Sequence, residues 1–368
     1  MKADRNGYML KGQLAQKGYD WWWHSLLAED PATGEIHPFF IEYYVINPGL
    51  SRGAPVMGQL PANQEKGIKP CYAMIKAGKW GKDKSQLHNF YGIQNFSASA
   101  TEMNVAIGDN TATEKRIKGS VKVSPQEAKD HPEWMTDAGE MSWDLEILRK
   151  VPYSVGYGAS SLFRALHVFE MYWHVGGLMT AYTGWIDYNG KRYIVKPELS
   201  VGYQDKNWGK DYTNPWIWLN CTRFFDDSGK LIHDTAFTLG GGNPKVWGIS
   251  VGKKILVAFY HEKKIYEFNF SKIFFQKQKW NCRMDDQYVW WDVEVMNRRH
   301  KLELHFKCPV DGMIKVQYEN PDGQNNHKNL WNGGFASGTL RLSRLDSNKE
   351  TLIVQLRGEY GGCEYGAY

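Results

Sequence analysis

Cysteine is scarce in this chain, and its spacing excludes the structural devices that cysteines usually build. The five cysteines in 368 residues are scattered and odd in number, and no two stand in a Cys-x-x-Cys spacing. A disulfide framework is not expected in a chain of this size, and no zinc site is predicted. The 11 histidines lie far apart and no His-Glu-x-x-His motif occurs, so we expect no metal site.

Charge of one sign and long apolar runs are also lacking. The chain holds 45 Lys and Arg against 40 Asp and Glu, and the two signs are mixed along it. No basic run has the length typical of nucleic-acid binding, so no nucleic-acid partner is expected. No stretch approaches the roughly 18 apolar residues of a membrane-spanning helix, and the N-terminal residues have no apolar core of a signal peptide. We predict a soluble, cytoplasmic protein, and weak attraction of its net charge of +5 to an anionic membrane surface stays open.

Two common catalytic signatures are missing as well. The glycine run at 240–242, followed by Asn243, lacks the Lys-Ser/Thr of a phosphate-binding loop, and we interpret it as a hairpin turn. No Gly-x-Ser-x-Gly sequence occurs, so the nucleophile elbow of the α/β-hydrolases is not predicted. We expect no cofactor.

Aromatic residues, in contrast, are abundant. The chain contains 16 Trp, 21 Tyr and 16 Phe, which make up 14% of it. Large aromatic side chains favour β-strands, and they also suit the lining of a cavity for an apolar ligand. A β-barrel with an apolar lumen would satisfy both interpretations.

Most of the chain is typical of short strands separated by turns. Residues 264–270 and 301–306 alternate apolar and polar side chains, and residues 254–260 are a largely apolar run. Turn sequences such as Asn189-Gly190 punctuate these segments. Many strands at short intervals indicate an all-β barrel or sandwich. Residues 160–173 differ, because apolar residues recur there at helical spacing, and we predict a short helix at a domain junction.

Two short matches suggest that the chain is an internal duplication. The sequence Trp-Asp-Leu-Glu-Ile at 143–147 is echoed by Trp-Asp-Val-Glu-Val at 291–295, an offset of 148. The aromatic cluster that ends at His24 is echoed by the one that ends at His174, an offset of 150. Chance similarity among tryptophan-rich strands is the alternative. We predict two domains, 1–158 and 159–368, with the polar and aromatic site in the second.

Residues 172–220 concentrate polar, ionisable and aromatic side chains. In a strand, Tyr203, Asp205 and Asn207 would point to one face, because side chains alternate. A carboxyl in an apolar pocket has its pKa raised, so Asp205 could stay protonated and act as a general acid towards an alkene. Aromatic faces could stabilise a developing carbocation. The candidates for that role are Trp173, Trp185, Trp208, Trp216 and Trp218.

This segment also resembles a known family. The run GWIDYNGKRY, followed by KNWG and PWIWLNC, resembles the tocopherol cyclase family, in which a Gly-Trp-Ile strand, a Lys-Asn-Trp-Gly motif and a Trp-x-Trp strand follow in this order. The resemblance is dense over residues 172–221 and diffuse elsewhere. More distantly, His174 with Tyr203-x-Asp205 is similar to carotenoid hydratases and lipocalin-like pericyclases.

The resemblance implies a fold and an activity. The fold would be two tandem lipocalin-like (calycin) antiparallel β-barrels, with the pocket between them or in one of them. The activity would be a cofactor-independent cyclase or hydratase that adds a hydroxyl across the double bond of an apolar prenylated substrate. Asp205 would donate the proton, Tyr203 and His174 would orient it or relay protons, and Asn207 would bind the substrate or the acid. His24 would be the counterpart of His174 in the first half.

Less specific interpretations exist for the same residues. Asp205 could cap a turn or pair with a basic neighbour, His174 could be a buried core histidine, and the tryptophans could simply pack the core. Two other functions also fit an aromatic lumen. One is a non-catalytic carrier of a lipid or pigment, and the other is a pericyclase that supplies shape and one or two hydrogen bonds.

Overall fold

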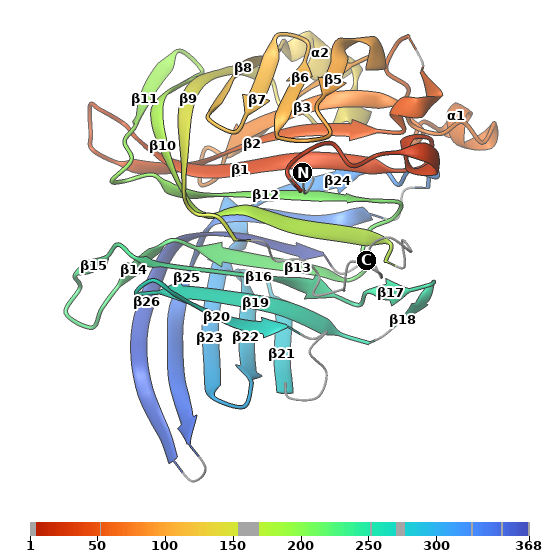
Figure 1. The fold of residues 1–368 in the computed structure, drawn as a ribbon. Coiled ribbons are helices and arrows are strands. Elements are labelled where there is room, and N and C mark those ends of the chain that lie inside the picture. The colour runs from red at the N-terminus through yellow and green to blue at the C-terminus, as the bar shows by residue number, and fades with distance from the viewer. Residues whose placement is uncertain are drawn as a thin grey trace.

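The protein is almost entirely β-structure. A computed structural model describes residues 5–51, 53–153, 169–250, 252–269, 277–324, 327–346 and 349–366. These residues form two antiparallel sheets of 12 strands each and a small hairpin. The sheets are barrel-like and stack one above the other, with the N-terminal barrel uppermost in Figure 1. The prediction of an all-β chain with two tandem lipocalin-like barrels is confirmed.

The first barrel contains the N-terminal half of the chain and more. Its strands are β1 (Tyr19–Glu29), β2 (Ile36–Ile46), β3 (Tyr72–Lys79), β4 (Ser85–Tyr91), β5 (Phe96–Ala98), β6 (Asn104–Ile107), β7 (Asn110–Thr113), β8 (Arg116–Val123), β9 (Gly139–Val151), β10 (Met171–Tyr188), β11 (Lys191–Val195) and β12 (Val201–Gly209). Two short helices, α1 (Pro61–Glu65) and α2 (Pro125–Asp130), lie in its connections. Ser124 caps α2 through a capping box with Glu127.

Hydrogen bonds bring the strands of the first barrel into a nearly closed ring. The strand order begins β4-β3-β2-β1. Strand β1 pairs with both β11 and β12, each of which also pairs with β10, and the order continues through β9 and β8 to β7, β6 and β5. The Asn89 side chain of β4 reaches across to β8, where it donates to the Lys122 carbonyl at 3.0 Å and accepts from the Lys122 amide at 3.1 Å. These bonds satisfy backbone groups that an open sheet edge would leave exposed.

The second barrel follows the same plan. Its strands are β13 (Trp216–Cys221), β14 (Arg223–Phe225), β15 (Leu231–Ile232), β16 (Thr235–Gly242), β19 (Lys254–His261), β20 (Lys264–Asn269), β21 (Lys277–Met284), β22 (Tyr288–Met296), β23 (His300–Pro309), β24 (Ile314–Tyr318), β25 (His327–Asp346) and β26 (Lys349–Gly366). Strands β17 (Lys245–Val246) and β18 (Ile249–Ser250) form the separate hairpin. The predicted strands at 254–260 and 264–270 correspond to β19 and β20, with the end of the second beyond the described residues.

The two sheets divide later in the chain than the predicted boundary at 158/159. Strands β10, β11 and β12 pair with β1 and β9, so the first sheet continues to Gly209, and the second begins at Trp216. The reason is long-range pairing: β12 fills the space between β1 and β10, which local sequence patterns do not reveal.

Two local predictions are corrected by the strand assignments. The predicted helix over 160–173 lies mostly outside the described residues, but its last three residues, from Met171, begin strand β10. The glycine run at 240–242 is not a hairpin turn, because it forms the end of β16 opposite β13. Glycine is needed there for space, since a Cβ on Gly240 would lie 2.9 Å from the Trp173 ring.

The second of the two repeat matches is also corrected. The aromatic segments that end at His24 and His174 lie in β1 and β10, which flank β12 in the same barrel. They are therefore neighbours in one sheet and not counterparts in two.

Three clusters of buried apolar side chains hold the molecule together. One fills the first barrel around Trp143, and one fills the second around Trp291. The third contains residues of both barrels, among them Trp23 of β1 and Trp218 of β13. The two barrels are therefore joined by an aromatic interface, along which β12 runs (Figure 1).

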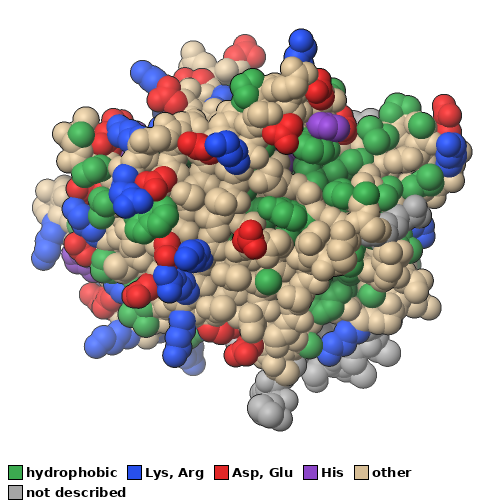
Figure 2. Space-filling model, turned by 90° about the horizontal axis from the view of Figure 1, so that it is seen from above, with side chains coloured by type: hydrophobic (Ala, Val, Ile, Leu, Met, Phe, Trp, Pro, Cys, Tyr) green, Lys and Arg blue, Asp and Glu red, His purple; other side chains and the backbone are tan. Residues whose placement is uncertain are grey.

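The surface carries charges of both signs. On the face seen in Figure 2, Lys and Arg side chains are interspersed with Asp and Glu side chains. Among the described residues, no helix has both the length and the apolar character needed to cross a membrane.

Candidate active site between the barrels

Strand β12 carries the predicted polar face. Tyr203, Asp205 and Asn207 point from β12 towards the second barrel, as strand alternation predicts, while Gln204 and Lys206 point into the first barrel. Asp205 lies opposite Trp23 of β1 in the strand register. The polar face of β12 is therefore framed by tryptophan-bearing strands.

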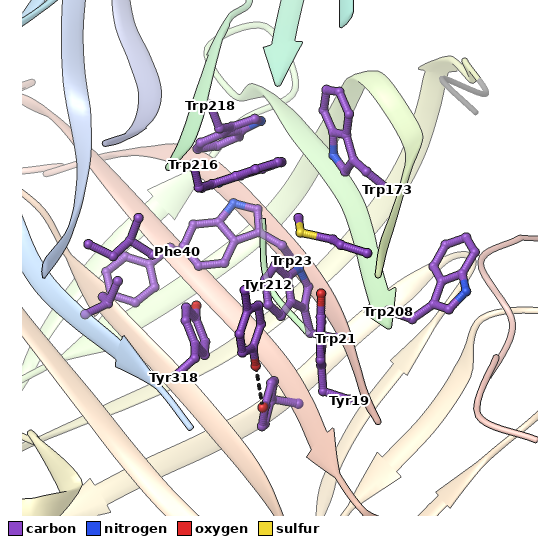
Figure 3. Close-up of a cluster of buried hydrophobic side chains, with 14 of the residues drawn as sticks. Tyr19, Trp21, Trp23, Phe40, Trp173, Trp208, Tyr212, Trp216, Trp218 and Tyr318 are labelled. Atoms are coloured by element: carbon purple, nitrogen blue, oxygen red, sulfur yellow. Dashed lines mark hydrogen bonds between the residues drawn. The ribbon is translucent and has the colours of Figure 1, made fainter. Parts of the chain in front are cut away.

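A pocket lies against this face. It is small, with about 10 Å³ left between its walls, and it is lined by side chains of both barrels. Its lining residues are Trp21, Trp23, Asp205, Asn207, Trp216, Trp218, Tyr318 and Glu364. Figure 3 shows the aromatic members converging from β1, β13 and β24 on one volume. The pocket thus lies between the two barrels, whereas the domain prediction placed the site in the second one.

Asp205 is buried and held by two donors on the same oxygen. Its Oδ2 accepts from the Trp173 indole Nε1 at 2.7 Å and from the Tyr203 hydroxyl at 3.1 Å. Burial raises the pKa of Asp205 to about 8, and the charges of Glu364 and Glu42 act in the same direction. The carboxyl is therefore largely protonated at neutral pH, with Oδ1 as the oxygen available to carry the proton.

Tyr203 ties the acid to the second barrel. Besides donating to Asp205, its hydroxyl accepts from Trp218 Nε1 at 3.4 Å and lies 3.2 Å from the Thr238 hydroxyl. Burial raises the pKa of Tyr203 well above its ordinary value, so the phenol stays neutral. Its position depends on both barrels being docked.

Glu364, at the end of β26, is a second carboxyl in the pocket. Its Oε2 accepts from Trp216 Nε1 at 2.7 Å, and its Oε1 accepts from the Asn332 amide at 2.9 Å. Asn332 in turn accepts from Trp80 Nε1 at 2.7 Å, which fixes the orientation of its amide. Burial raises the pKa of Glu364, while these two donors and the charge of Lys76 act against that rise.

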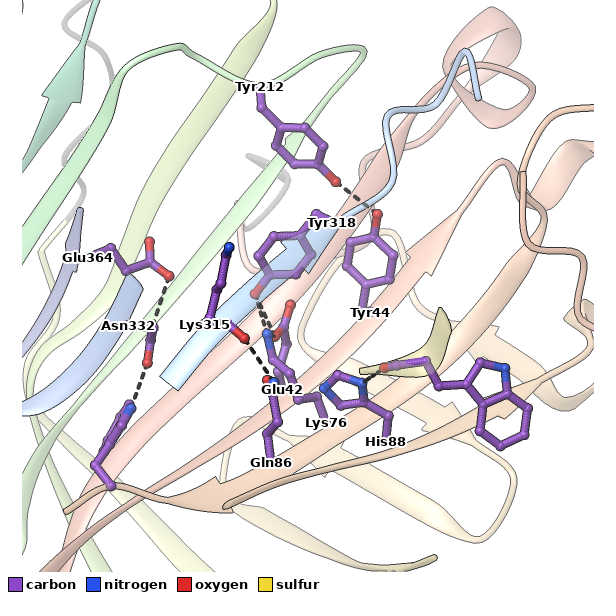
Figure 4. A network of polar contacts seen from close by, with 12 residues as sticks. Glu42, Tyr44, Lys76, Gln86, His88, Tyr212, Lys315, Tyr318, Asn332 and Glu364 are labelled. Atoms are coloured by element: carbon purple, nitrogen blue, oxygen red, sulfur yellow. Dashed lines mark hydrogen bonds and ion pairs between the residues drawn. The ribbon is translucent and has the colours of Figure 1, made fainter. Parts of the chain in front are cut away.

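A buried ion pair borders the pocket on the side of β24. Lys76 Nζ lies 2.6 Å from Glu42 Oε2, and the Tyr318 hydroxyl donates to the same carboxylate at 2.9 Å. Lys76 and Tyr318 also contact each other directly. Figure 4 shows this group near the Glu364–Asn332 pair. Strands β2 and β3 of the first barrel and β24 of the second thus meet through charge-assisted hydrogen bonds.

Two pocket residues carry polar atoms that the described residues do not satisfy. Asn207 Oδ1 and Trp23 Nε1 are buried and have no hydrogen-bond partner in the described part of the chain. One is an acceptor and the other a donor. Unpaired buried polar groups cost free energy, and a bound ligand or water can complete their hydrogen bonds.

The two predicted histidines lie elsewhere. His174 follows Trp173 along β10, so it points to the opposite face, where it pairs in register with Lys206 inside the first barrel. His24 Nδ1 lies 3.0 Å from the Tyr182 hydroxyl, also inside that barrel. Burial lowers the pKa of each to about 3, so both are neutral. Strand alternation therefore separates both histidines from Asp205.

The five predicted tryptophans divide into two groups. Trp173 donates to Asp205, and Trp216 and Trp218 line the pocket. Trp208 faces away from it and stacks on Tyr172, with ring centres 5.4 Å apart. Trp185 is half-buried under the Arg192 guanidinium, at the far part of β10.

Several pocket residues were not predicted. Trp21 and Trp23 were recognised as an aromatic cluster, but only the pairing of β1 with β12 places them beside the pocket. Glu364 and Tyr318 carry no local signal, because they come from strands more than a hundred residues after β12. The described residues contain no group of three or more His, Cys, Asp or Glu side chains placed to hold a metal ion.

A comparison with protein families agrees with the resemblance of the 172–221 segment. The model of the tocopherol cyclase-like family matches residues 62–367. The chain belongs to this family. The match covers all but the first strands of the N-terminal barrel, and it includes β12 and the whole second barrel.

Two plant members of this tocopherol cyclase-like family align with parts of the chain. A probable chloroplastic tocopherol cyclase of Oryza sativa subsp. japonica is 34% identical over 108 residues, which are 28% of this chain and 21% of that protein. The chloroplastic tocopherol cyclase of Zea mays is 30% identical over 152 residues, which are 40% of this chain and 29% of that protein. The alignments thus span less than a third of either plant protein.

Two solved structures align over nearly the whole chain. A putative AttH from Nitrosomonas europaea has a TM-score of 0.49 and 10% identity, and the alignment covers 95% of this chain and 93% of that one. Kievitone hydratase from Nectria haematococca has a TM-score of 0.44 and 9% identity, with 100% and 96% covered. These likenesses are too distant to transfer an activity.

Proposed function

We propose that this protein is a cofactor-independent acid catalyst that protonates an alkene of an apolar, prenylated substrate and adds a hydroxyl across it. The observation that carries the proposal is Asp205, a buried carboxyl whose pKa is raised to about 8 inside an aromatic pocket. A carboxyl that stays neutral at physiological pH is a suitable proton donor. Membership of the tocopherol cyclase-like family supports the same class of reaction.

The donors around Asp205 suit such a proton transfer. Trp173 and Tyr203 both donate to Oδ2, so Oδ1 is left to carry the proton towards the substrate. Once that proton has left, the same two hydrogen bonds stabilise the carboxylate. Their positions do not need to change during the step, which keeps reorganisation small.

The aromatic walls suit the cation that protonation creates. Trp21, Trp23, Trp216 and Trp218 present indole rings to the pocket. The face of an aromatic ring carries negative quadrupole density and attracts a cation, most strongly for tryptophan. These side chains are also buried, which limits the water that would otherwise capture the carbocation.

Asn207 and Trp23 suit the polar end of the substrate. The unsatisfied Asn207 Oδ1 could accept from a phenol or quinol hydroxyl, and Trp23 Nε1 could donate to its oxygen. The space left between the lining side chains is only about 10 Å³, far below the range of about 300–1,000 Å³ typical of ligand sites. We therefore expect the lining side chains to move apart when the reacting end of the substrate binds.

A non-catalytic carrier is the less favoured function. A carrier of lipid or pigment needs only the apolar lining, whereas this pocket contains two buried carboxyls, Asp205 and Glu364. Burying ionisable groups costs free energy that binding an apolar ligand does not recover.

The test uses 2-prenylhydroquinone as the probe, in deuterated buffer. The parent protein is expected to form the chromanol and to place one deuterium on the former alkene CH carbon. Asp205→Asn should lower kcat by at least about a hundredfold, the usual range for loss of a general acid. Quenching of tryptophan fluorescence measures probe binding, which should change little.

Glu319→Gln serves as the matched control, because Glu319 is also a buried carboxyl with its pKa raised by burial, to about 7, but does not line the pocket. It should retain turnover. A parent protein that binds the probe without converting it would support the carrier, and full activity of Asp205→Asn would remove Asp205 from the mechanism.

A further inference from the structure

The two pocket carboxyls are held in different ways. Asp205 receives both of its donors on Oδ2 and comes from β12 of the first barrel. Glu364 receives one donor on each oxygen, from Trp216 and Asn332, and comes from β26 of the second barrel. A single occupied oxygen leaves the other free for a proton, whereas a donor on each oxygen favours the carboxylate.

The donors to Glu364 cannot reverse their roles. An indole N–H can only donate, and the Asn332 amide is oriented by Trp80, which donates to its oxygen. Charge adds to the difference. Burial and the charge of Glu42 raise the pKa of both carboxyls, but Lys76 lowers that of Glu364, whereas the charge of Glu364 raises that of Asp205 further. One carboxyl is therefore arranged to hold a proton and the other to accept one.

We propose that Glu364 is the general base of the reaction and takes the proton from the hydroxyl that adds to the alkene. This inference rests on the proposed function and names the general base that the proposed reaction requires. Addition of O–H across a double bond needs a donor to carbon and an acceptor from oxygen, and the pocket places one carboxyl for each task.

The step balances without any co-reactant. The alkene electrons form a bond to the proton of Asp205 Oδ1, leaving a tertiary carbocation and the Asp205 carboxylate. A lone pair of the hydroxyl oxygen then forms the C–O bond to that carbon, and the O–H proton passes to Glu364. Transfer of one proton from Glu364 to solvent and one from solvent to Asp205 restores the starting state.

The variants Glu364→Gln and Glu364→Asp test the role. With 2-prenylhydroquinone, Glu364→Gln should lower kcat by about 10²-fold or more while the dissociation constant from tryptophan quenching stays within a few-fold. Glu364→Asp, which keeps the base but shortens it, should recover part of kcat. Glu319→Gln again controls for loss of a buried carboxyl.

The pH dependence of the parent protein gives a second, variant-free test. The charged and titratable groups that face Glu364 are Asp205 on β12, Glu42 on β2, Lys76 on β3 and Tyr318 on β24. An ionised base and a neutral acid together require a bell-shaped profile of kcat, with an acid limb from Glu364 and an alkaline limb from Asp205. The acid limb should disappear in Glu364→Gln.

The outcomes separate the two proposals. Wild-type kcat in Glu364→Gln, with Asp205→Asn inactive, would overturn the base and leave the acid in place. Should Glu364→Gln fail to fold by circular dichroism, a parent profile that stays flat on the acid side would overturn the base on its own. A parent protein without turnover would instead contradict the proposed function.

A separate feature, the hairpin of β17 and β18, points to a second interaction. Trp247 at its tip is 67% exposed and Ile249 is 72% exposed, although large apolar side chains are usually buried. The hairpin is not paired with either barrel sheet. It follows directly from the end of β16, where Gly242 pairs with the pocket residue Trp216.

The segment that contains the hairpin carries positive charges only, and one of them, Lys245, pairs with Glu170 at 3.6 Å. Between Asp234 and Glu262 the chain carries three lysines, Lys245, Lys253 and Lys254, and no acidic residue. An exposed tryptophan beside lysines suits the interface of an anionic bilayer, where the indole lies at headgroup depth and the lysines meet lipid phosphates.

We infer that the hairpin tip inserts into the interface of an anionic lipid membrane. This contact would lie beside the end of β13 that carries the pocket residue Trp216. This inference does not depend on the reaction. Co-sedimentation with phosphatidylcholine vesicles, with and without phosphatidylglycerol, tests it. The parent protein should bind the anionic vesicles with a blue shift of its tryptophan emission.

The double variant Trp247→Ser/Ile249→Ser should weaken vesicle binding by roughly tenfold or more, as expected for loss of two inserted apolar side chains. Leu148→Ser is the matched control, since Leu148 is 65% exposed on β9 of the other barrel. No binding of the parent protein, or an equal loss in the Leu148 variant, would overturn the inference.

Discussion

Asp205 shows how burial and a few hydrogen bonds set the chemistry of one side chain. The ordinary pKa of an aspartate is 3.8, and in this pocket it is about 8. Between these values the folded protein holds a proton that the unfolded chain has released. The free energy of unfolding therefore falls as pH rises from about 4 to about 8, and this contribution levels off above that range.

We predict that Asp205→Asn removes this dependence. The amide has nearly the same shape and never ionises, so the variant should gain stability relative to the parent as pH rises through the window from 3.8 to about 8. Urea denaturation of both proteins across that range measures the difference. A constant difference at all pH values would contradict the raised pKa.

Lys206, the neighbour of Asp205 on the strand, is a buried base whose pKa is lowered by burial. It points into the first barrel, forms a fully buried ion pair with Asp20, and lies 3.8 Å from the centre of the Trp22 ring. Burial lowers the pKa of Lys206 to about 8 and raises that of Asp20 to about 6, although each partner's charge opposes the shift.

Removing one partner of this pair should be costly. We predict that Lys206→Met lowers the free energy of unfolding by about 3–5 kcal/mol, because Asp20 is then buried without its counter-charge. Chemical denaturation measures this loss. The double variant Asp20→Asn/Lys206→Met should recover much of the stability, and a double variant as unstable as the single one would refute this explanation.

Strand β16 shows how one element shapes the site of another. Its Gly240 faces the Trp173 ring of β10, and an added Cβ would lie 2.9 to 3.2 Å from three ring atoms. The glycine run at 240–242 thus lets the two barrels approach closely enough for the indole to reach Asp205. This close approach accounts for a sequence feature that was interpreted as a turn.

Gly240→Ala should lower the rate of catalysis, although Gly240 does not line the pocket. We predict that displacement of the Trp173 ring weakens its hydrogen bond to Asp205 and lowers kcat for the prenylhydroquinone probe by roughly tenfold, the worth of one such bond. The alkaline limb of the pH profile should also move upwards, because a lost donor raises the pKa of the acid. An unchanged pH profile would show that the Trp173 hydrogen bond does not set the pKa of Asp205.

The alternation of side chains along a strand predicted reliably which residues share one face of that strand. It correctly placed Tyr203, Asp205 and Asn207 on one face, since successive side chains of any strand point to opposite sides. The same rule excludes His174, which directly follows Trp173 on β10. A sequence match to histidine-containing relatives carried no information about that direction.

The whole molecule is held by the interface between its barrels. The shared aromatic cluster includes side chains of both barrels, and hydrogen bonds such as Asn47 Nδ2 to the Pro321 carbonyl at 2.8 Å also join them. Domains joined by a large apolar interface do not move independently.

We therefore predict a single cooperative unfolding transition for the two barrels. Differential scanning calorimetry should give equal calorimetric and van't Hoff enthalpies. Trp21→Ala, which removes a ring that stacks on Tyr318 across the interface at 5.1 Å, should shift the whole transition downwards. Two separate transitions in the parent protein would show that the barrels fold independently.

The sequence by itself determined the all-β fold, the polar face of β12 and the family, because these depend on alternation and on short motifs within one strand. Only the tertiary structure decided that the sheets divide after Gly209, that Trp21 and Trp23 line the pocket, and that Glu364 lies in the same pocket as Asp205. These features depend on pairing and docking between strands far apart in the chain. Local patterns do not encode such contacts, since any apolar strand face can pack against many others.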